Sequence, residues 1–264
     1  VMIGFLDTGI DYQNRVFRNL DGTTRIVGIW DQTIQTGRTP QGLYYGTEYT
    51  EEMINAALRS EDPLQIVPSV DTDGHGTFVA SAAAGGAEVG KRFLGAAPEA
   101  SIAMVKLKPA KNYLKEFFAI AQDAVCYQEN DIMLGLRYLN DLARKQGMPL
   151  VICVALGTSF GGHNGDSLLA DILDIYATVR NRCVVVGTGN EAARRHHYFN
   201  RFTDAQDMRT AEIRVGEGTQ SFAVELWSTL PNIVMVSVTS PSGERTGMIP
   251  IRLGYLLSLI HISE

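Results

Sequence analysis

The sequence predicts an α/β fold in which helices cover both faces of a parallel sheet, followed by the start of an antiparallel β unit. Two observations predict it. Up to about residue 200, short β-branched or apolar runs alternate with longer segments of helical periodicity. After about residue 205 the hydrophobic period becomes two, with turns between the segments, as in antiparallel strands. The 264 residues, of which 45% are hydrophobic, can form one large domain or two modest ones.

In the first part, apolar runs at residues 1–6 and 100–107 predict strands, and an amphipathic pattern at residues 130–146 predicts a helix. Residues 33–69 are polar, punctuated by glycine and proline, and long for a connection. We therefore interpret them as an insertion on the α/β core, in which residues 51–58 can form a helix.

The clearest unit is a β-α-β crossover, expected to be right-handed. Residues 151–156 predict a strand buried on both faces, and residues 183–186 its parallel neighbour. Asp166 or Ser167 is available to cap the intervening helix. Its apolar residues recur at helical spacing: Leu168, Leu169, Ile172, Leu173, Tyr176 and Val179.

The second part has alternating segments at residues 212–215, 222–226 and 233–238. We therefore predict an α/β core over residues 1–204 and the start of an inserted, jelly-roll-like antiparallel β domain over residues 205–256.

Both ends of the chain look incomplete. Val1 lies inside a predicted strand, so we expect the chain to begin within a domain. Residues 257–264 are what the DNA string CTG TCT CTT ATA CAC ATC TCC GAG encodes, which looks like the end of a common transposase-based library adapter. We interpret this segment as sequencing read-through and exclude it from functional argument.

Composition narrows the function classes. With 23 basic and 29 acidic residues and no dense basic block, the chain is not expected to bind nucleic acid. No apolar run approaches the roughly 18 to 20 residues of a membrane-spanning helix. Cys126, Cys153 and Cys183 are too few and too irregularly spaced for a disulfide framework or a zinc site. We expect Cys153 and Cys183 to be small buried hydrophobic residues.

Three motifs carry candidate chemistry, and the first is Asp7 in Phe5-Leu6-Asp7-Thr8-Gly9. It places a carboxylate at the carboxyl end of a buried strand, where the active residues of open parallel sheets lie. Taken alone, such a residue can be catalytic, hold magnesium in a phosphate-handling fold, or cap a helix.

The second motif, Asp73-Gly74-His75-Gly76-Thr77, is more informative, because glycines flank a histidine where a small-residue helix begins. The helix dipole disfavours a cationic histidine at this position, so His75 needs a carboxylate partner if it accepts a proton during a reaction. Asp7 is the candidate partner.

The third motif, Gly187-Thr188-Gly189-Asn190, follows a strand and presents a side-chain amide. Asn190 can donate a hydrogen bond to an oxyanion without bringing a charge. Alternatively, Asn190 is an asparagine that only forms a turn.

In this order on a parallel sheet, the motifs resemble those of the subtilisin-like serine peptidases, family S8. The segment Leu94-Gly95-Ala96-Ala97-Pro98 adds to the likeness, which covers residues 1 to about 200. The insertion before His75, residues 105–109 and the later β unit look most like the clostridial germination-type, or Csp-like, subtilases.

The resemblance implies a role for each residue. Asp7 would orient His75 and stabilise its imidazolium, His75 would act as general base and then acid, and Asn190 would donate to the tetrahedral oxyanion. Residues 125–127 would be the edge strand that pairs with substrate, and Phe78, which replaces a second histidine, is expected to pack. The walls of the primary specificity pocket would be Ala155, where the family has serine, Leu156, Gly157, Gly187, Thr188 and Gly189.

The family's nucleophile is absent from these residues. Its serine lies in Gly-Thr-Ser-x-Ala-x-Pro after the oxyanion asparagine, and no such motif follows Asn190. Ser159, in Gly157-Thr158-Ser159, precedes Asn190 and is not expected to be the nucleophile. As given, the chain is expected to be inactive in peptide hydrolysis.

The sequence leaves three functions to compare. The first is a serine endopeptidase that activates another protein during spore germination, spore-associated or cytoplasmic in a bacterium, with a protein or peptide as substrate. The second is a catalytically inactive pseudopeptidase that senses a germinant or binds a partner. The third, a phosphoryl-transfer enzyme with magnesium on Asp7, lacks a phosphate loop and leaves the His75 motif unexplained.

No cofactor is expected. Calcium is common in the family, but residues 85–90 lack the oxygen-rich run that would indicate a site. His196 and His197 are expected in a solvated loop, and the sequence indicates no oligomeric state.

An independent assembly of the gene tests how the chain continues. We expect it to pass Leu256 with residues other than those at 257–264, and to encode Gly-Thr-Ser-x-Ala after the β domain if the protein is a peptidase. An uninterrupted genomic reading of the present residues 257–264 would contradict the adapter interpretation.

Overall fold

The computed structural model describes residues 1–219, 222–229 and 231–250, which fall into two compact units. The first unit comprises residues 1–159 and 165–223, and the second comprises residues 160–164 and the described residues from Val224 onward. This division places residues 205–223 with the first unit, whereas we predicted a boundary at residue 205. The adapter-like segment 257–264 lies outside the described residues.

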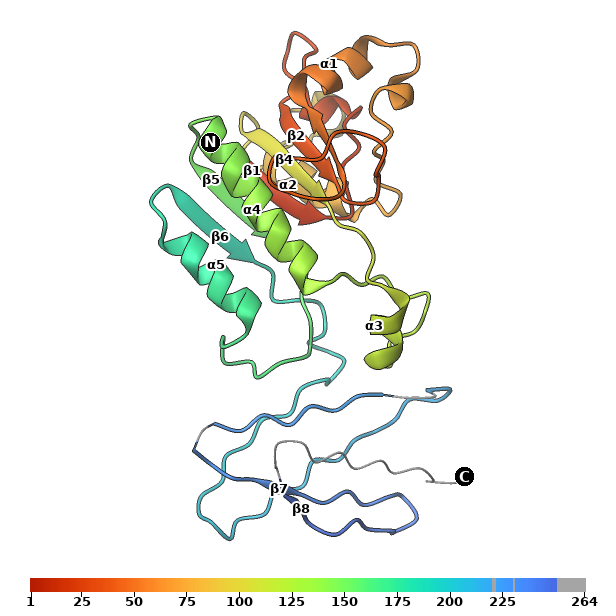
Figure 1. The fold of residues 1–264 in the computed structure, drawn as a ribbon, viewed down its shortest axis with the longest axis vertical. Helices are drawn as coiled ribbons and strands as arrows, with labels where there is room; N and C mark the ends of the chain where they lie inside the picture. The colour runs from red at the N-terminus through yellow and green to blue at the C-terminus, as the bar shows by residue number, and fades with distance from the viewer. Residues whose placement is uncertain (220–221, 230, 251–264) are drawn as a thin grey trace. The chain divides into compact units, whose positions relative to one another are not determined.

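A six-stranded sheet in the order β3-β2-β4-β1-β5-β6 forms the first unit (Figure 1). All neighbours pair in parallel except β3, which runs antiparallel to β2. The predicted fold class, a mostly parallel sheet with helices, is therefore confirmed. The strands are Met2–Asp7 (β1), Ile26–Asp31 (β2), Thr47–Thr50 (β3), Ser101–Lys106 (β4), Leu150–Val154 (β5) and Arg182–Val186 (β6).

Helices cover both faces of this sheet (Figure 1). Alternate residues of β1 belong to two separate hydrophobic clusters, Met2 and Leu6 to one and Ile3 and Phe5 to the other. The first cluster includes α4 (Glu129–Lys145) and is flanked by α5 (Leu168–Thr178), and the second includes α1 (Glu51–Arg59) and α2 (His75–Ala84). In the described residues, the remaining helical segments are α3 (Asn112–Phe117) and three short 3₁₀ turns, Arg15–Phe17, Pro63–Gln65 and Val89–Lys91.

The predicted crossover from β5 through α5 to β6 forms, with β5 and β6 parallel. Ser167 is the N-cap of α5, and its hydroxyl accepts a hydrogen bond from the backbone N–H of Ala170 at 3.1 Å. Of the two candidates for the cap, the structure selects Ser167.

Burial on this side of the sheet differs from the prediction. The β5 strand ends at Val154 rather than at residue 156, and its side chains alternate between buried and half-buried. Cys153 is half-buried and Cys183 is exposed, because β6 is the last strand of the sheet and α5 packs on one of its faces only. On α2, which covers the opposite face of the sheet, Phe78 is 72% exposed, although we expected it to pack.

The insertion at residues 33–69 is attached to the sheet more closely than its composition indicates. It contains α1, as predicted, and also β3, which was not predicted and extends the sheet beyond β2. The indole N–H of Trp30 in β2 donates to the backbone oxygen of Tyr45 at 3.1 Å. The Tyr45 hydroxyl in turn donates to Asp131 on α4 at 2.6 Å.

The second unit has little regular structure in the described residues. Its strands Met235–Val236 (β7) and Ile249–Pro250 (β8) form a two-stranded antiparallel sheet. Of the predicted strand 233–238 only β7 forms. No strand forms at residues 222–226, which cross the boundary between the units, or at residues 212–215, which belong to the first unit. Ile213, Val224 and Leu226 are more than half exposed, so in the described residues their alternation has no apolar surface to pack against.

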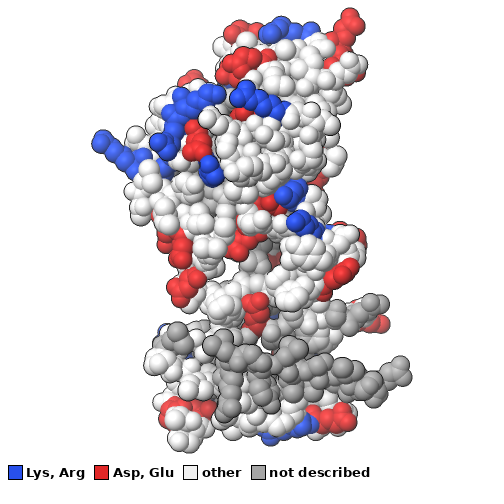
Figure 2. All heavy atoms as spheres, in the orientation of Figure 1, with Lys and Arg blue, Asp and Glu red and all other residues white. Residues whose placement is uncertain are grey.

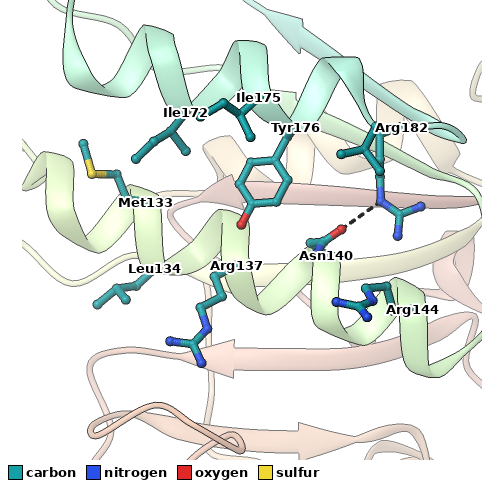
Figure 3. Close-up of a pocket in the computed structure, with 10 residues that line it drawn as sticks. Met133, Leu134, Arg137, Asn140, Arg144, Ile172, Ile175, Tyr176 and Arg182 are labelled. Carbon is teal, nitrogen blue, oxygen red and sulfur yellow. Dashed lines mark hydrogen bonds between the residues drawn. The ribbon is translucent and has the colours of Figure 1, made fainter.

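A groove of about 570 Å³ lies between α4, α5 and the start of β6 (Figure 3). Apolar side chains from both helices line it together with three arginines, Arg137, Arg144 and Arg182. The Arg182 Nε donates to the side-chain oxygen of Asn140 at 2.9 Å and ties β6 to α4. Around this face of the molecule, acidic and basic side chains lie interspersed (Figure 2).

Among the described residues, none of the helices combines the length and the hydropathy that a membrane-spanning helix needs. The expectation that the chain does not bind nucleic acid stays a prediction.

Arg25 joins three segments around α2. It is 8% exposed, and its guanidinium donates to the carbonyl oxygens of Ala100 at 2.8 Å, Ala84 at 2.6 Å and Val16 at 2.5 Å. The Val16 oxygen has a second donor, the backbone N–H of Gly86. Arg25 is therefore the side chain that holds the C-terminal end of α2.

Replacement of Arg25 by methionine is expected to lower the free energy of unfolding by about 2 kcal/mol or more. The Ala84 and Ala100 carbonyls lose their charged donor, and a buried unpaired acceptor costs about 1–3 kcal/mol. Urea unfolding followed by circular dichroism measures the change. Arg59→Met at the exposed end of α1 is the matched control, with an expected change within about 0.5 kcal/mol; equal losses in the two variants would contradict the role of Arg25.

Candidate active site

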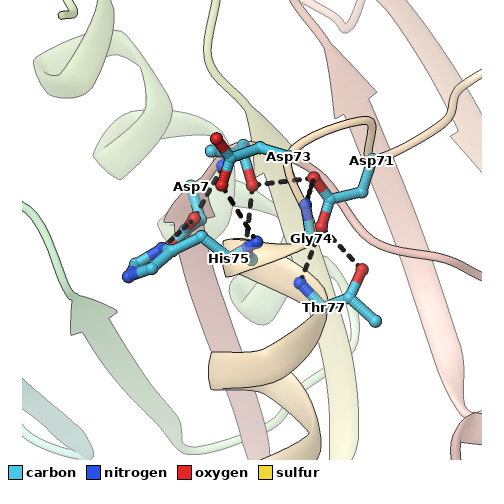
Figure 4. A network of polar contacts seen from close by, with 8 residues as sticks. Asp7, Asp71, Asp73, Gly74, His75 and Thr77 are labelled. Atoms are coloured by element: carbon cyan, nitrogen blue, oxygen red, sulfur yellow. Dashed lines mark hydrogen bonds and ion pairs between the residues drawn. The ribbon is translucent and has the colours of Figure 1, made fainter. Parts of the chain in front are cut away.

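Asp7 and His75 lie side by side at the carboxyl edge of the sheet (Figure 4). Asp7 is the last residue of β1 and is 1% exposed, and His75 is the first residue of α2. The Nδ1 atom of His75 is 2.7 Å from the Oδ1 atom of Asp7. Because a carboxylate can only accept, Nδ1 carries the proton in this contact. The other ring nitrogen, Nε2, is then the basic one.

The two glycines beside His75 make this contact sterically feasible in different ways. Gly74 is the N-cap of α2 and has φ +87°, which a residue with a Cβ rarely adopts. Gly76 faces the backbone that follows β1. A Cβ on Gly76 would lie 2.2 Å from the carbonyl oxygen of Gly9 and 3.1 Å from the Cβ of Asp7. Any side chain there would push α2 away from Asp7.

The first backbone N–H groups of α2 are satisfied by side chains from outside the helix. The N–H of His75 donates to Asp73 at 3.3 Å, that of Gly76 to the Thr8 hydroxyl at 2.9 Å, and that of Thr77 to Asp71 at 2.9 Å. The sequence motifs include Thr8 without a role and do not include Asp71. An aspartate shortly before a helix start is a capping signal that could have indicated Asp71.

The neighbouring carboxylates control the protonation of His75. The hydrogen bond to Asp7 raises the pKa of His75 above its ordinary value, burial opposes this shift, and the charges of Asp7, Asp73 and Asp71 add to it. For Asp71 the largest single effect is burial, which raises the pKa. The hydrogen bonds from Thr77, Gly74 and Thr8 together outweigh it, so the pKa of Asp71 lies below its ordinary value.

The predicted substrate-binding edge, residues 125–127, lies within electrostatic reach of these carboxylates. Burial, followed by the charges of Asp7, Asp73 and Asp71, raises the pKa of Tyr127 to about 12. Tyr127 forms an isolated antiparallel bridge with Pro109, and the backbone N–H of Ala110 donates to the Cys126 oxygen at 2.8 Å.

The other predicted site residues follow β5 and β6 at the same edge of the sheet. Since β1, β5 and β6 are parallel neighbours, their carboxyl ends lie at one edge. Residues 155–157 and 187–189 continue from β5 and β6, and the N–H of Gly187 donates to the Val154 oxygen at 3.0 Å. Asn190 follows and is exposed. The pocket role of residues 155–157 and 187–189 and the oxyanion role of Asn190 stay predictions.

In the described part of the chain, no group of three or more acidic, histidine or cysteine side chains is placed to hold a metal ion. We therefore assign no ligands for calcium, and the expectation that no cofactor is needed stays a prediction. The groove between α4 and α5 is also separate from this site, because it shares no residue with it and lies on the face of the sheet opposite α2.

Comparison with known proteins identifies the family. The family described as Peptidase_S8, the subtilase family, matches residues 1–246. The chain belongs to the subtilase family. The resemblance that we inferred from the three motifs is therefore confirmed.

Two solved structures are similar to this chain to different degrees. The Clostridium perfringens CspB protease superposes with a TM-score of 0.75 and 32% sequence identity, over 96% of this chain and 49% of its own length. A structure described as S41 psychrophilic protease has a TM-score of 0.44 and 22% identity, over 72% of this chain and 46% of its own. The chain thus spans about half the length of these structures. No curated protein matches this chain.

A pH titration tests the contact between Asp7 and His75. We expect His75 to titrate above its ordinary pKa near 6.5 and Asp7→Asn to lower that pKa, because the variant removes the charged acceptor. The sign for stability follows by linkage: the contribution of the pair is complete below the unfolded-state pKa and is lost as the pH rises through the higher pKa of the folded protein.

The measurement is a histidine-ring NMR titration, with the resonance assigned by a His75→Gln variant. Glu88→Gln, which removes an exposed carboxylate paired with Lys91, is the control and is expected to leave the titration unchanged. Equal pKa values for His75 in the wild-type and Asp7→Asn proteins would contradict the pairing.

Proposed function

We propose that the protein is a serine endopeptidase whose triad includes Asp7 and His75, with the nucleophilic serine in a part of the protein outside these residues. One observation carries the proposal: a buried carboxylate binds Nδ1 of a histidine that is 42% exposed at the carboxyl edge of the sheet. In this orientation Nε2 is the basic nitrogen available to a nucleophile. Membership in the subtilase family supports the same reading.

The proposed mechanism follows from this geometry. Asp7 holds the tautomer with the proton on Nδ1, so the Nε2 lone pair can take the proton of the serine hydroxyl as it attacks the peptide carbonyl. The resulting imidazolium is stabilised by the adjacent carboxylate. Nε2 then returns the proton to the leaving amine. The Asn190 amide would donate to the oxyanion of the tetrahedral intermediate.

The proposed substrate is another protein. Membership in a peptidase family supports a protein or peptide as substrate. On the resemblance to the Csp-like subtilases, with which the similarity to the CspB protease agrees, we propose that it activates a second protein during spore germination. We also propose a spore-associated or cytoplasmic bacterial location, on the resemblance to the Csp-like subtilases. In the proposed site, the substrate backbone would pair with residues 125–127, and its side chain before the cleaved bond would enter between residues 155–157 and 187–189.

Activity of the protein from the complete gene tests this function. We expect turnover of a labelled protein substrate and labelling by a fluorophosphonate, which requires an activated serine. Asp7→Asn should lower kcat by about 10⁴-fold, because it holds the wrong histidine tautomer. Asn190→Ala should lower it by about 10² to 10³-fold, a magnitude taken from the corresponding asparagine of subtilisin.

His163→Ala, in the second unit, is the control and should retain activity. Residues 1–256 alone should neither turn over substrate nor react with the probe, and turnover abolished by a serine-directed reagent would identify Ser159 as a nucleophile after all. A complete, folded protein that shows neither turnover nor labelling would refute the peptidase and support the alternative, a pseudopeptidase that senses a germinant or binds a partner.

A further inference from the structure

Asp71 connects the two backbone segments that carry Asp7 and His75 (Figure 4). Its Oδ1 atom accepts hydrogen bonds from the Thr8 hydroxyl at 2.8 Å and from the backbone N–H of Gly74 at 2.9 Å. Its Oδ2 atom accepts from the backbone N–H of Thr77 at 2.9 Å and from the Thr77 hydroxyl at 2.6 Å. Both carboxylate oxygens therefore face the start of α2, and one also reaches the residue that follows Asp7.

The contact with Thr8 closes a loop of hydrogen bonds around the Asp7–His75 pair. The same Thr8 hydroxyl that donates to Asp71 accepts from the backbone N–H of Gly76 at 2.9 Å. Thr8 follows Asp7 in the chain, and Gly76 follows His75. Asp71 and Thr8 thus fix the two backbones to each other immediately beside the side-chain contact.

The residues that precede Asp71 are hydrogen-bonded to the sheet. The Lys106 ammonium, at the end of β4, donates to the backbone oxygen of Val70 at 2.7 Å. The Ser69 hydroxyl donates to Asp31, at the end of β2, at 2.6 Å. The segment before Asp71 is therefore anchored to two strands of the sheet. The hydrogen bonds of Asp71 in turn fix the start of α2 relative to those strands.

We propose that Asp71 is a positioning residue of the active site, which sets the distance and orientation of His75 relative to Asp7. An effect of Asp71 on peptide hydrolysis rests on the proposed function. Its effect on the alignment of His75 with Asp7 rests on the hydrogen bonds described above.

The neighbouring Asp73 separates positioning from charge. Like Asp71, it carries a carboxylate close to His75, and its charge ranks before that of Asp71 among those acting on the histidine. Its contact with the histidine residue, however, is a single hydrogen bond of 3.3 Å from the backbone N–H, and it is exposed. If Asp71 acted only through charge, its removal would change His75 no more than the removal of Asp73.

The test compares Asp71→Asn with Asp73→Asn in the protein from the complete gene. Two quantities are measured by NMR: the pKa of His75 and the exchange protection of its Nδ1–H. We expect Asp71→Asn to lower the pKa of His75 more than Asp73→Asn does, and to abolish the protected Nδ1–H signal that Asp73→Asn retains. Effects on His75 that are equal or smaller in a folded Asp71→Asn protein would overturn the proposal.

A second pair of variants covers the case in which Asp71→Asn does not fold. Thr77→Val removes one hydroxyl donor to Asp71 without changing any charge, and Thr77→Ser keeps it. We expect Thr77→Val to weaken the protection of the Nδ1–H and Thr77→Ser to preserve it. Identical protection in the two variants would overturn the proposal.

Kinetics link the positioning to the proposed function. We expect Asp71→Asn to lower kcat by about 10- to 100-fold with KM changed by less than about threefold, since a misplacement of about 1 Å costs up to about 10²-fold. Asp73→Asn should stay within about threefold of the wild type. If the wild-type protein shows no hydrolysis while the NMR differences are observed, the peptidase proposal fails and the role of Asp71 in aligning His75 stands.

Discussion

A carboxylate buried at the end of a central strand has to be paired, and much of the first unit around Asp7 follows from that requirement. Burial of an unpaired charge is costly, and removal of one partner of a buried pair typically costs several kcal/mol. At 1% exposure, Asp7 receives the backbone N–H of Thr8 at 2.7 Å and the Nδ1 of His75. The second of these partners comes from a different layer of the fold, so α2 has to begin at the sheet edge and in close contact with it.

The close contact of α2 with the sheet edge explains the identity of residues that are far apart in the sequence. Gly76 lacks a side chain because the Gly9 carbonyl occupies the space where a Cβ would lie. Asp71 and Thr8 replace the local side-chain cap that Gly74 cannot provide. The long segment before Asp71 is anchored to β2 and β4. These anchors explain how a polar insertion can place the Asp71 carboxylate against the start of α2.

The sequence was sufficient for the fold class and for the Asp7–His75 pair, because both leave local patterns. Buried parallel strands show as apolar runs, and a histidine between glycines at a helix start is rare enough to be informative. The sequence was insufficient where the outcome depends on a partner from elsewhere in the chain. The strand β3 exists because β2 offers an edge, Cys183 is exposed because β6 ends the sheet, and the alternation at residues 212–215 produces no strand because the described structure gives it no partner. The hydrogen bond between Asp71 and Thr8 leaves no local pattern for the same reason, since it spans the whole insertion.

The helix α2 is held at both ends by residues distant in the sequence. At its start the backbone N–H of Gly76 donates to the Thr8 hydroxyl, and at its end the Ala84 carbonyl accepts from Arg25. A helix of 10 residues is marginal on its own in water, and Thr8 and Arg25 reach its two ends only once the sheet has formed. Formation of α2 is therefore expected to be a late, long-range event in folding rather than a local one. A chain that has not assembled its sheet has no aligned histidine. Under the proposed function, a partly folded molecule would therefore carry no hydrolytic centre while it is itself most open to cleavage.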